Sequence, residues 1–261
     1  MDQKTYIPTV ACLCPTAWRP WLLENAIACF EAQDYPAARR RLLILDDSGI
    51  YEPQTGDGWE LFATAARYPS LPEKYHRLTE LAGDADVIAV WEDDDIYLPW
   101  HLSALVGAMG WRSDGPLRPW AKPAAVWTMC PDLKKESGAG RFHASLAAWR
   151  LFLARLGGWP LTHRGDFDLQ LIGRLSAAAR PADPCESAQP SYVFRWASTG
   201  SPHGQGFMRS PADETWFDRA FEGGAAAFDA WQRRIGWQSG TPLRPALDEE
   251  TRRVFQAIPG A

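Results

Sequence analysis

The sequence predicts an α/β fold with a mostly parallel central sheet, flanked by helices and followed by a C-terminal helical extension. Short apolar runs typical of buried strands occupy residues 9–14, 41–45 and 86–91. Segments with helical spacing of apolar residues separate these runs, and strands that alternate with helices form parallel sheets. Acidic residues directly follow the second and third runs. Because the carboxyl ends of parallel strands meet at one edge, this edge is the expected ligand-binding side.

The first hundred residues supply the predicted parallel sheet. The first strand ends at Pro15, and the second runs directly into Asp46. The first helix ends before Pro36, since a proline cannot continue a helix and disfavours helical backbone in the residue before it. In order, we expect strand 9–14, helix 21–33, strand 41–45, helix 73–82, strand 86–91 and helix 99–111.

The second half has a more mixed pattern. We expect a Gly- and Pro-rich loop at 113–123, a strand at 124–129, helices at 146–156 and 166–176, turns at 181–190, a strand at 191–196, and helices at about 213–235 and 248–257. Residues 1–206 are predicted to form one domain, with halves at about 1–112 and 113–206. Residues 207–261 are then a helical extension packed on the same domain.

Composition excludes several classes of protein. The formal net charge of −5 argues against a broad nucleic-acid interface. No apolar stretch approaches the roughly 18 residues that span a bilayer, and no signal-like run follows residues 1–4. Five cysteines are scattered without paired metal spacing, which indicates a reducing compartment and predicts a cytoplasmic protein.

The acidic run Glu92-Asp93-Asp94-Asp95 is the most informative local feature. Four adjacent carboxylates at the end of an apolar strand repel one another, and a divalent cation offsets that repulsion. Oxygen ligands suit Mg²⁺ or Mn²⁺, and Mg²⁺ commonly uses one or two protein carboxylates, with water and substrate phosphates completing its shell. A solvated acidic turn is the alternative. The position directly after a buried strand favours a metal site.

Several segments together resemble one enzyme family. Residues 90–99 resemble the DXD segment of GT-A glycosyltransferases, particularly the inverting family 2. Residues 14–20 resemble that family's first-strand exit, and residues 33–36 with 43–48 resemble its second strand. The match covers roughly residues 8–205. The resemblance implies a GT-A (Rossmann-like) fold and transfer of a sugar from a nucleoside-diphosphate sugar, UDP-linked by default, to an acceptor hydroxyl.

The resemblance also implies roles for the donor-side residues. One of the second-strand acids contacts the base or ribose, and the metal is Mn²⁺ or Mg²⁺. Glu92 stands where the family often has Asp. The implied donor contacts are Asp46 or Asp47, Thr16 and Arg19 beside the same nucleotide, Lys74 near the phosphates, and Asp93 near the ribose and sugar; the metal ligands are Asp94 and Asp95. For Lys74 the alternative is an ordinary surface lysine on a helix.

The acceptor side is implied by a second set of motifs. Residues 157–160 followed by Asp166 resemble the family's GG-aromatic turn and ED helix start, although Gly165 replaces the usual Glu. The match makes Asp166 the general base, and a base opposite the leaving group gives inversion. The alternative is that Asp166 only caps its helix. Further candidates are His143 lining the acceptor pocket, His203 at the pyrophosphate or metal, and Trp159 or Trp196 stacking on a sugar.

Two other classes of protein compete with this interpretation. A sugar nucleotidyltransferase has a similar sheet but usually carries a Gly-rich, basic phosphate loop, which residues 15–20 lack. A non-catalytic carbohydrate-binding protein that kept the fold is the second alternative. Substitutions at Asp94 and Asp166 separate these alternatives from a transferase.

Overall fold

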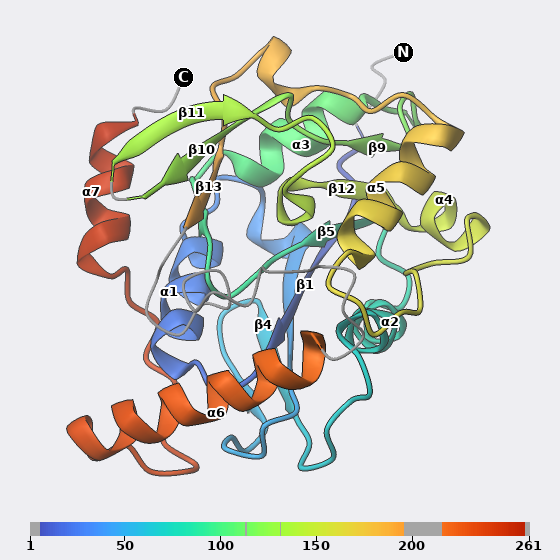
Figure 1. The fold of residues 1–261 in the computed structure, drawn as a ribbon. Coiled ribbons are helices and arrows are strands. Elements are labelled where there is room, and N and C mark those ends of the chain that lie inside the picture. The colour runs from blue at the N-terminus through green and yellow to red at the C-terminus, as the bar shows by residue number, and fades with distance from the viewer. Residues whose placement is uncertain (1–5, 113, 131, 196–215, 259–261) are drawn as a thin grey trace.

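A seven-stranded central sheet with helices against it forms the body of the molecule (Figure 1). The structure is a computed structural model, and it describes residues 6–112, 114–130, 132–195 and 216–258. Across the sheet the strands are β3 (Gln54–Thr55), β4 (Trp59–Ala63), β2 (Arg40–Asp46), β1 (Val10–Thr16), β5 (Val87–Val90), β12 (Ala147–Trp149) and β9 (Trp120–Ala121). The helices are α1 (Pro20–Glu31), α2 (Leu71–Leu81), α3 (His101–Met109), α4 (Arg150–Arg155), α5 (Phe167–Ala178), α6 (Trp216–Ile235) and α7 (Glu249–Ala257).

The centre of this sheet is parallel, which confirms the predicted α/β class. Strand β1 pairs in parallel with β2 and with β5, and β2 pairs in parallel with β4. All seven residues of β1 are buried, as expected for an apolar strand covered on both faces. In register, Thr16 lies opposite Asp46. The carboxyl ends of the first two strands therefore deliver polar side chains to the same edge.

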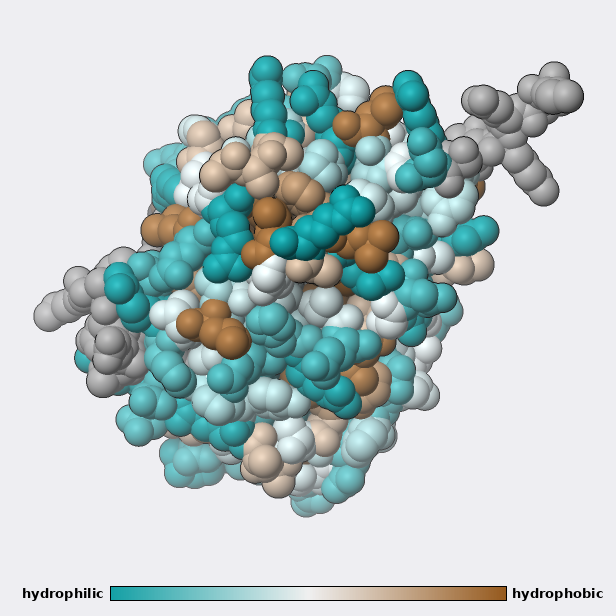
Figure 2. Space-filling view, turned by 90° about the vertical axis from the view of Figure 1, so that its right-hand side faces the viewer, coloured by the Kyte–Doolittle hydropathy of each residue, from teal (hydrophilic) through white to brown (hydrophobic). Residues whose placement is uncertain are grey.

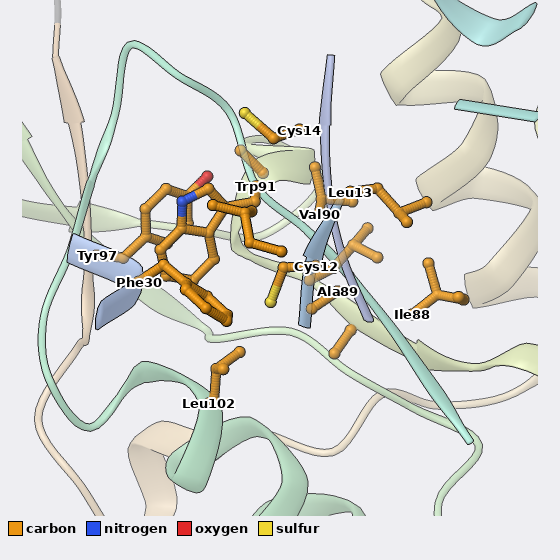
Figure 3. Close-up of a cluster of buried hydrophobic side chains, with 14 of the residues drawn as sticks. Cys12, Leu13, Cys14, Phe30, Ile88, Ala89, Val90, Trp91, Tyr97 and Leu102 are labelled. Carbon is orange, nitrogen blue, oxygen red and sulfur yellow. The ribbon is translucent and has the colours of Figure 1, made fainter. Parts of the chain in front are cut away.

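Large aromatic side chains pack beneath the end of β5. Trp91 stacks on Tyr97 with ring centroids 3.8 Å apart, and Phe30 of α1 meets the same indole edge-on. The indole N–H of Trp91 donates to the carbonyl of Ala26 at 3.2 Å. Figure 3 shows these rings beside the apolar side chains of β1 and β5. Residues 92–95, which lie between Trp91 and Tyr97 in sequence, are thus anchored at both ends by one buried aromatic stack.

A second, four-stranded sheet begins immediately after residues 92–95. Its strand order is β11 (Leu133–Ser137), β10 (Ala125–Met129), β13 (Tyr192–Arg195) and β6 (Ile96–Tyr97). Strand β6 pairs antiparallel with β13, and β13 pairs in parallel with β10. We call residues 92–95 the acidic loop. It joins β5 of the central sheet to β6 of the second sheet, so both sheets fix its position.

The structure departs from the predicted elements mainly in the second half. The predicted helix at 146–156 is wrong at its start, where β12 pairs antiparallel with β5 and only Arg150–Arg155 is helical. The predicted loop at 113–123 contains β9, which pairs with β12. The first error has a clear cause: the small buried side chains of Ala147 and Ala148 fit the sheet interior, whereas alanine alone favours a helix.

The two predicted C-terminal helices are present and contact the first half of the chain. In Figure 1, α6 crosses below β1 and β4, and α7 lies beside α1. Phe228 of α6 packs against Trp18, with ring centroids 5.6 Å apart. Ahead of α7, the main-chain N–H of Asp248 donates to the side chain of Asn25 at 3.0 Å. In the ranges that the structure describes, no helix has the length and apolarity to cross a membrane.

The face shown in Figure 2 is mostly hydrophilic, with separate apolar areas between polar side chains. Over the described residues, the large hydrophobic side chains that are exposed are scattered along the chain, apart from the adjacent Tyr6 and Ile7: Tyr6, Ile7, Leu117, Leu151, Leu161, Leu169 and Ile235. Such scattered exposure is ordinary for a protein surface. The cysteines of the described ranges are all unpaired, and Cys12 and Cys14 are buried in β1.

Candidate active site

Polar side chains converge at the carboxyl ends of β1, β2 and β5. Strand β1 ends at Thr16, β2 at Asp46, and β5 is followed by the acidic loop. Thr16 Oγ1 donates to Asp93 Oδ2 at 2.5 Å, which joins the end of β1 to the acidic loop. Asp46 and Asp47 thus lie at the same edge of the central sheet as the acidic loop, as predicted.

Arg19 is the main counter-charge of the acidic loop. Its guanidinium lies 2.8 Å from Asp93 Oδ1 and 2.9 Å from Asp94 Oδ2, bridging two side chains that are almost fully buried. Burial raises the pKa of Asp93 to about 7, although Arg19 opposes this shift. Arg19 carries one positive charge and faces two buried carboxylates, so an added cation can neutralise the remaining negative charge.

The end of β2 carries a second buried cluster. Lys74 of α2 donates from Nζ to Asp47 Oδ1 and to the carbonyl of Thr16, both at 2.7 Å. Lys74 is buried, which excludes the alternative of a surface lysine. An ammonium group has three N–H donors, so one remains for a ligand. Asp46 accepts from the hydroxyl of Ser48 at 2.5 Å, and burial raises the pKa of Asp46 to about 6.

The two candidate metal ligands differ in how far their oxygens are already used. Asp95 accepts from the hydroxyl of Tyr192 at 2.5 Å and from the main-chain N–H of Arg195 at 3.1 Å. In Asp94 only Oδ2 is paired, and within the described part of the chain the buried Oδ1 has no hydrogen-bond partner. A free buried carboxylate oxygen fits a divalent cation. Of the two candidates, Asp94 therefore has the oxygen that is more available to a cation.

No complete protein cage for a metal is preformed. Among the described residues, three or more His, Cys, Asp or Glu side chains do not converge as a metal site. This arrangement agrees with a Mg²⁺ or Mn²⁺ ion that takes one or two carboxylates and relies on water and phosphate oxygens for the rest. His203, the third predicted ligand, lies outside the described residues, as does Trp196.

The fourth acid of the loop is turned to another partner. Glu92 lies 3.1 Å from His143 Nε2 and accepts a short hydrogen bond from the hydroxyl of Tyr75. Burial alone would raise the pKa of Glu92, but His143 and Tyr75 lower it to about 2. For His143 the directions are reversed: burial lowers its pKa, but the nearby carboxylates of Glu92 and Asp168 together outweigh this, and the pKa of His143 is raised overall. Asp168 Oδ2 lies 3.8 Å from His143 Nδ1, which links the loop to the start of α5.

Asp166 stands at the N-cap position of α5, but its side chain makes no capping hydrogen bond. Its carboxylate instead accepts from Arg164 at 2.9 Å and from Gln170 at 3.0 Å. The interpretation of Asp166 as only a helix cap is therefore wrong. The proposed stacking of Trp159 on a sugar is also wrong, because its indole is buried and stacks on Tyr75 with centroids 4.3 Å apart.

Comparison with solved structures identifies the fold. The mannosyltransferase PcManGT from Pyrobaculum calidifontis, solved with GDP-Man and Mn²⁺, is 18% identical, with a TM-score of 0.54 over 97% of this chain and 84% of that one. TarS from S. aureus, solved with UDP-GlcNAc, is 9% identical, with a TM-score of 0.55 over 87% of this chain and 74% of that one. No protein-family model and no curated protein sequence matches the chain. The chain has a GT-A-like glycosyltransferase fold.

Proposed function

We propose that this protein is a metal-dependent glycosyltransferase that moves a sugar from a nucleoside-diphosphate sugar, UDP-linked, to an acceptor hydroxyl with inversion. One observation carries the proposal: Thr16, Arg19, Asp93 and Asp94 form one connected, buried cluster at the carboxyl edge of a GT-A-like sheet. That edge is where open α/β sheets bind ligands. Similar structures hold GDP-Man with Mn²⁺ and UDP-GlcNAc, which supports a nucleotide-sugar donor.

In this proposal the donor lies along the ends of β2, β1 and β5. Asp46 or Asp47 accepts hydrogen bonds from the base or ribose, and Thr16 lies beside the same nucleotide. Lys74 holds Asp47 in place and keeps one N–H for the donor. Asp93 binds nearer the ribose and sugar. Residues 1–112 form the donor half of the domain, and residues 113–206 form the acceptor half.

Asp94 is the carboxylate best placed to hold Mn²⁺ or Mg²⁺, with Asp95 behind it and His203 as the further sequence candidate. When bound, the cation supplies Lewis-acid stabilisation to the departing diphosphate. Arg19 adds a second positive charge on the same side, since it already pairs with Asp93 and Asp94. A nucleoside diphosphate brings negative charge of its own, so Arg19 can exchange a carboxylate for a phosphate oxygen at little cost.

The acceptor enters from the side of α5. Asp166 takes the proton of the acceptor hydroxyl while that oxygen forms a bond to the anomeric carbon. The bond from the anomeric carbon to the diphosphate oxygen breaks, and the electron pair leaves with the diphosphate. Attack opposite the leaving group inverts the anomeric centre. The His143 imidazolium, paired with Glu92 and near Asp168, fixes the start of α5 relative to the acidic loop.

Ligand-dependent stabilisation tests the donor class directly. UDP-glucose, UDP-GlcNAc and GDP-mannose are each added with and without Mn²⁺, and the unfolding temperature is recorded. A ligand that binds only the native state at 100 times its Kd adds about 2.7 kcal/mol of stability. We expect one nucleotide sugar to raise the unfolding temperature, and to do so more strongly with Mn²⁺.

Two substitutions assign the chemistry. Asp94→Ala is expected to remove the Mn²⁺-dependent part of donor binding, and Asp166→Asn to keep donor binding but stop transfer. Glu80→Gln, on the exposed face of α2, is the matched control because Glu80 forms an exposed ion pair with Arg77 away from the acidic loop. Turnover that survives both active-site changes would exclude the transferase mechanism. Donor binding without turnover with any acceptor would favour a non-catalytic carbohydrate-binding protein.

A further inference from the structure

Arg195, the last residue of β13, holds the acidic loop from behind. Its Nε donates to the carbonyl of Asp94 at 2.7 Å, and its main-chain N–H donates to Asp95 Oδ1 at 3.1 Å. The Arg195 side chain is only 3% exposed, so its positive charge acts at short range on the loop. A buried guanidinium this close to a carboxylate cluster repels any cation that the cluster binds, unless a further negative charge outside the cluster offsets it.

The opposite charge comes from the C-terminal extension. Arg195 Nη1 lies 2.9 Å from Asp248 Oδ2 and 3.5 Å from Glu250 Oε2. The other oxygen of Asp248 caps α7 by accepting from the main-chain N–H of Thr251 at 2.6 Å. Asp248 is half-buried, which raises its pKa, but the Thr251 N–H and Arg195 lower the pKa overall. Asp248 is therefore a charged, well-anchored partner.

The same extension also reaches the donor side through α6. Phe221 and Phe228 pack against Trp18, which directly precedes Arg19. Trp18 has a left-handed backbone with φ of +63°, a conformation that costs a non-glycine residue energy and needs packing to hold it. Residues 216–258 therefore contact the donor edge twice, at Trp18 and at Arg195.

We propose that Asp248 is a positioning residue for the acidic loop: by neutralising Arg195 and fixing its guanidinium on the Asp94 carbonyl, Asp248 preserves the affinity of Asp94 for a divalent cation. The inference rests on the proposed function. Without the Asp248 charge, Arg195 keeps only the longer contact with Glu250 and the acidic loop itself as negative partners. It then competes with the metal through space and is free to turn toward the Asp94 and Asp95 carboxylates.

Asp248→Asn isolates the charge, since Asn caps a helix as well as Asp does. The measurement is the Kd of Mn²⁺ alone, followed by the Kd of UDP and of GDP with and without Mn²⁺. We expect Asp248→Asn to weaken Mn²⁺ binding by about tenfold. The affinity for UDP and GDP without metal is expected to stay within about twofold of wild type, because the contacts at β2 are untouched. A general loss of structure would instead lower the affinity for Mn²⁺ and the affinity for the nucleotide together.

Two more variants complete the test. Glu249→Gln removes one charge from the same turn, where Glu249 forms an exposed pair with Arg253, and is expected to change neither affinity. Glu250→Gln removes the longer, more exposed contact and is expected to weaken Mn²⁺ binding by about two- to threefold. It keeps the inference testable if Asp248→Asn folds poorly by circular dichroism.

The outcomes are distinct from those of the proposed function. Unchanged Mn²⁺ affinity in both Asp248→Asn and Glu250→Gln overturns the inference, as does an equal loss of metal-free nucleotide affinity. A wild-type protein that binds Mn²⁺ but no nucleotide sugar overturns the proposed function, while Mn²⁺ binding by the variants still decides the role of Asp248. A wild-type protein that binds no Mn²⁺ overturns both the inference and the metal dependence.

Discussion

Replacing Lys74 with methionine tests the buried cluster behind the donor edge. Lys74 and Asp47 form an ion pair at 2.7 Å, with side chains 3% and 0% exposed, and Lys74 also donates to the Thr16 carbonyl. Methionine has a similar length but no charge. The substitution leaves the Asp47 carboxylate buried, with the main-chain N–H of Tyr68 at 3.0 Å as its remaining partner described in the structure.

The expected cost follows from the burial of this pair. Removing one partner of a buried ion pair costs about 3–5 kcal/mol, because the other charge stays buried and uncompensated. Since whole domains are stable by only about 5–15 kcal/mol, Lys74→Met should remove about a fifth or more of the stability of a typical domain. The free energy of unfolding is measured by urea titration at pH 7.5 without metal, with circular dichroism and tryptophan fluorescence as the two signals that report unfolding.

Two controls determine whether the buried charge is the cause. The double variant Lys74→Met/Asp47→Asn is expected to be more stable than Lys74→Met alone, because it removes the stranded carboxylate. Arg77→Met breaks an exposed pair with Glu80 one turn away and should leave stability unchanged. A loss below about 1 kcal/mol for Lys74→Met, or a double variant no better than the single one, would refute the reasoning.

Three further predictions concern pH, packing and catalysis. Burial lowers the pKa of His101 to about 3, so below pH 6.5 the unfolded chain binds more protons than the folded chain, and stability decreases as the pH is lowered. In urea titrations, wild type should therefore lose about 2 kcal/mol more than His101→Gln between pH 7.5 and pH 5. Equal losses would exclude His101 as the cause of the pH dependence. Trp159→Ala should cost about 3–5 kcal/mol in the same assay, because it removes the ring stacked on Tyr75; a loss below 1 kcal/mol would contradict this packing. Asp166→Asn should lower kcat about 10²- to 10⁴-fold in a transfer assay with donor Kd unchanged, and an unchanged kcat would rule out Asp166 as the base.

The parallel half of the fold could be predicted because its signals are local. Strands β1, β2 and β5 each contain a continuous apolar run, and polar residues follow the run directly in β2 and one residue further on in β5, after Trp91. The interior of β12 carries no such signal, since two alanines in a row also suit a helix. Strand β4 alternates buried and exposed residues at the sheet margin, and its short pattern does not predict a strand. Its partner β2 is what stabilises it as a strand.

The convergence of the acidic side chains could be predicted for the same reason, since strand ends determine where Asp46 and the acidic loop lie. The pairing of individual charges could not, because it depends on contacts between distant segments. Glu92 with His143, and Arg195 with Asp248, join residues far apart in sequence. The sequence contains one sign of the first pair: position 92 has Glu where the resembled family often has Asp, and the longer Glu side chain reaches His143.

The pairing of Arg195 with Asp248 also bears on synthesis of the protein on the ribosome. The acidic loop is made first, and Asp248, the partner of the neighbouring Arg195, follows about 150 residues later, roughly 8–30 s at typical elongation rates. Strands β1, β2 and β5 can pair before then, whereas Arg195 gains its Asp248 partner only when the start of α7 has been made. The contact that fixes the Arg195 guanidinium is therefore among the last that the chain can form as it leaves the ribosome.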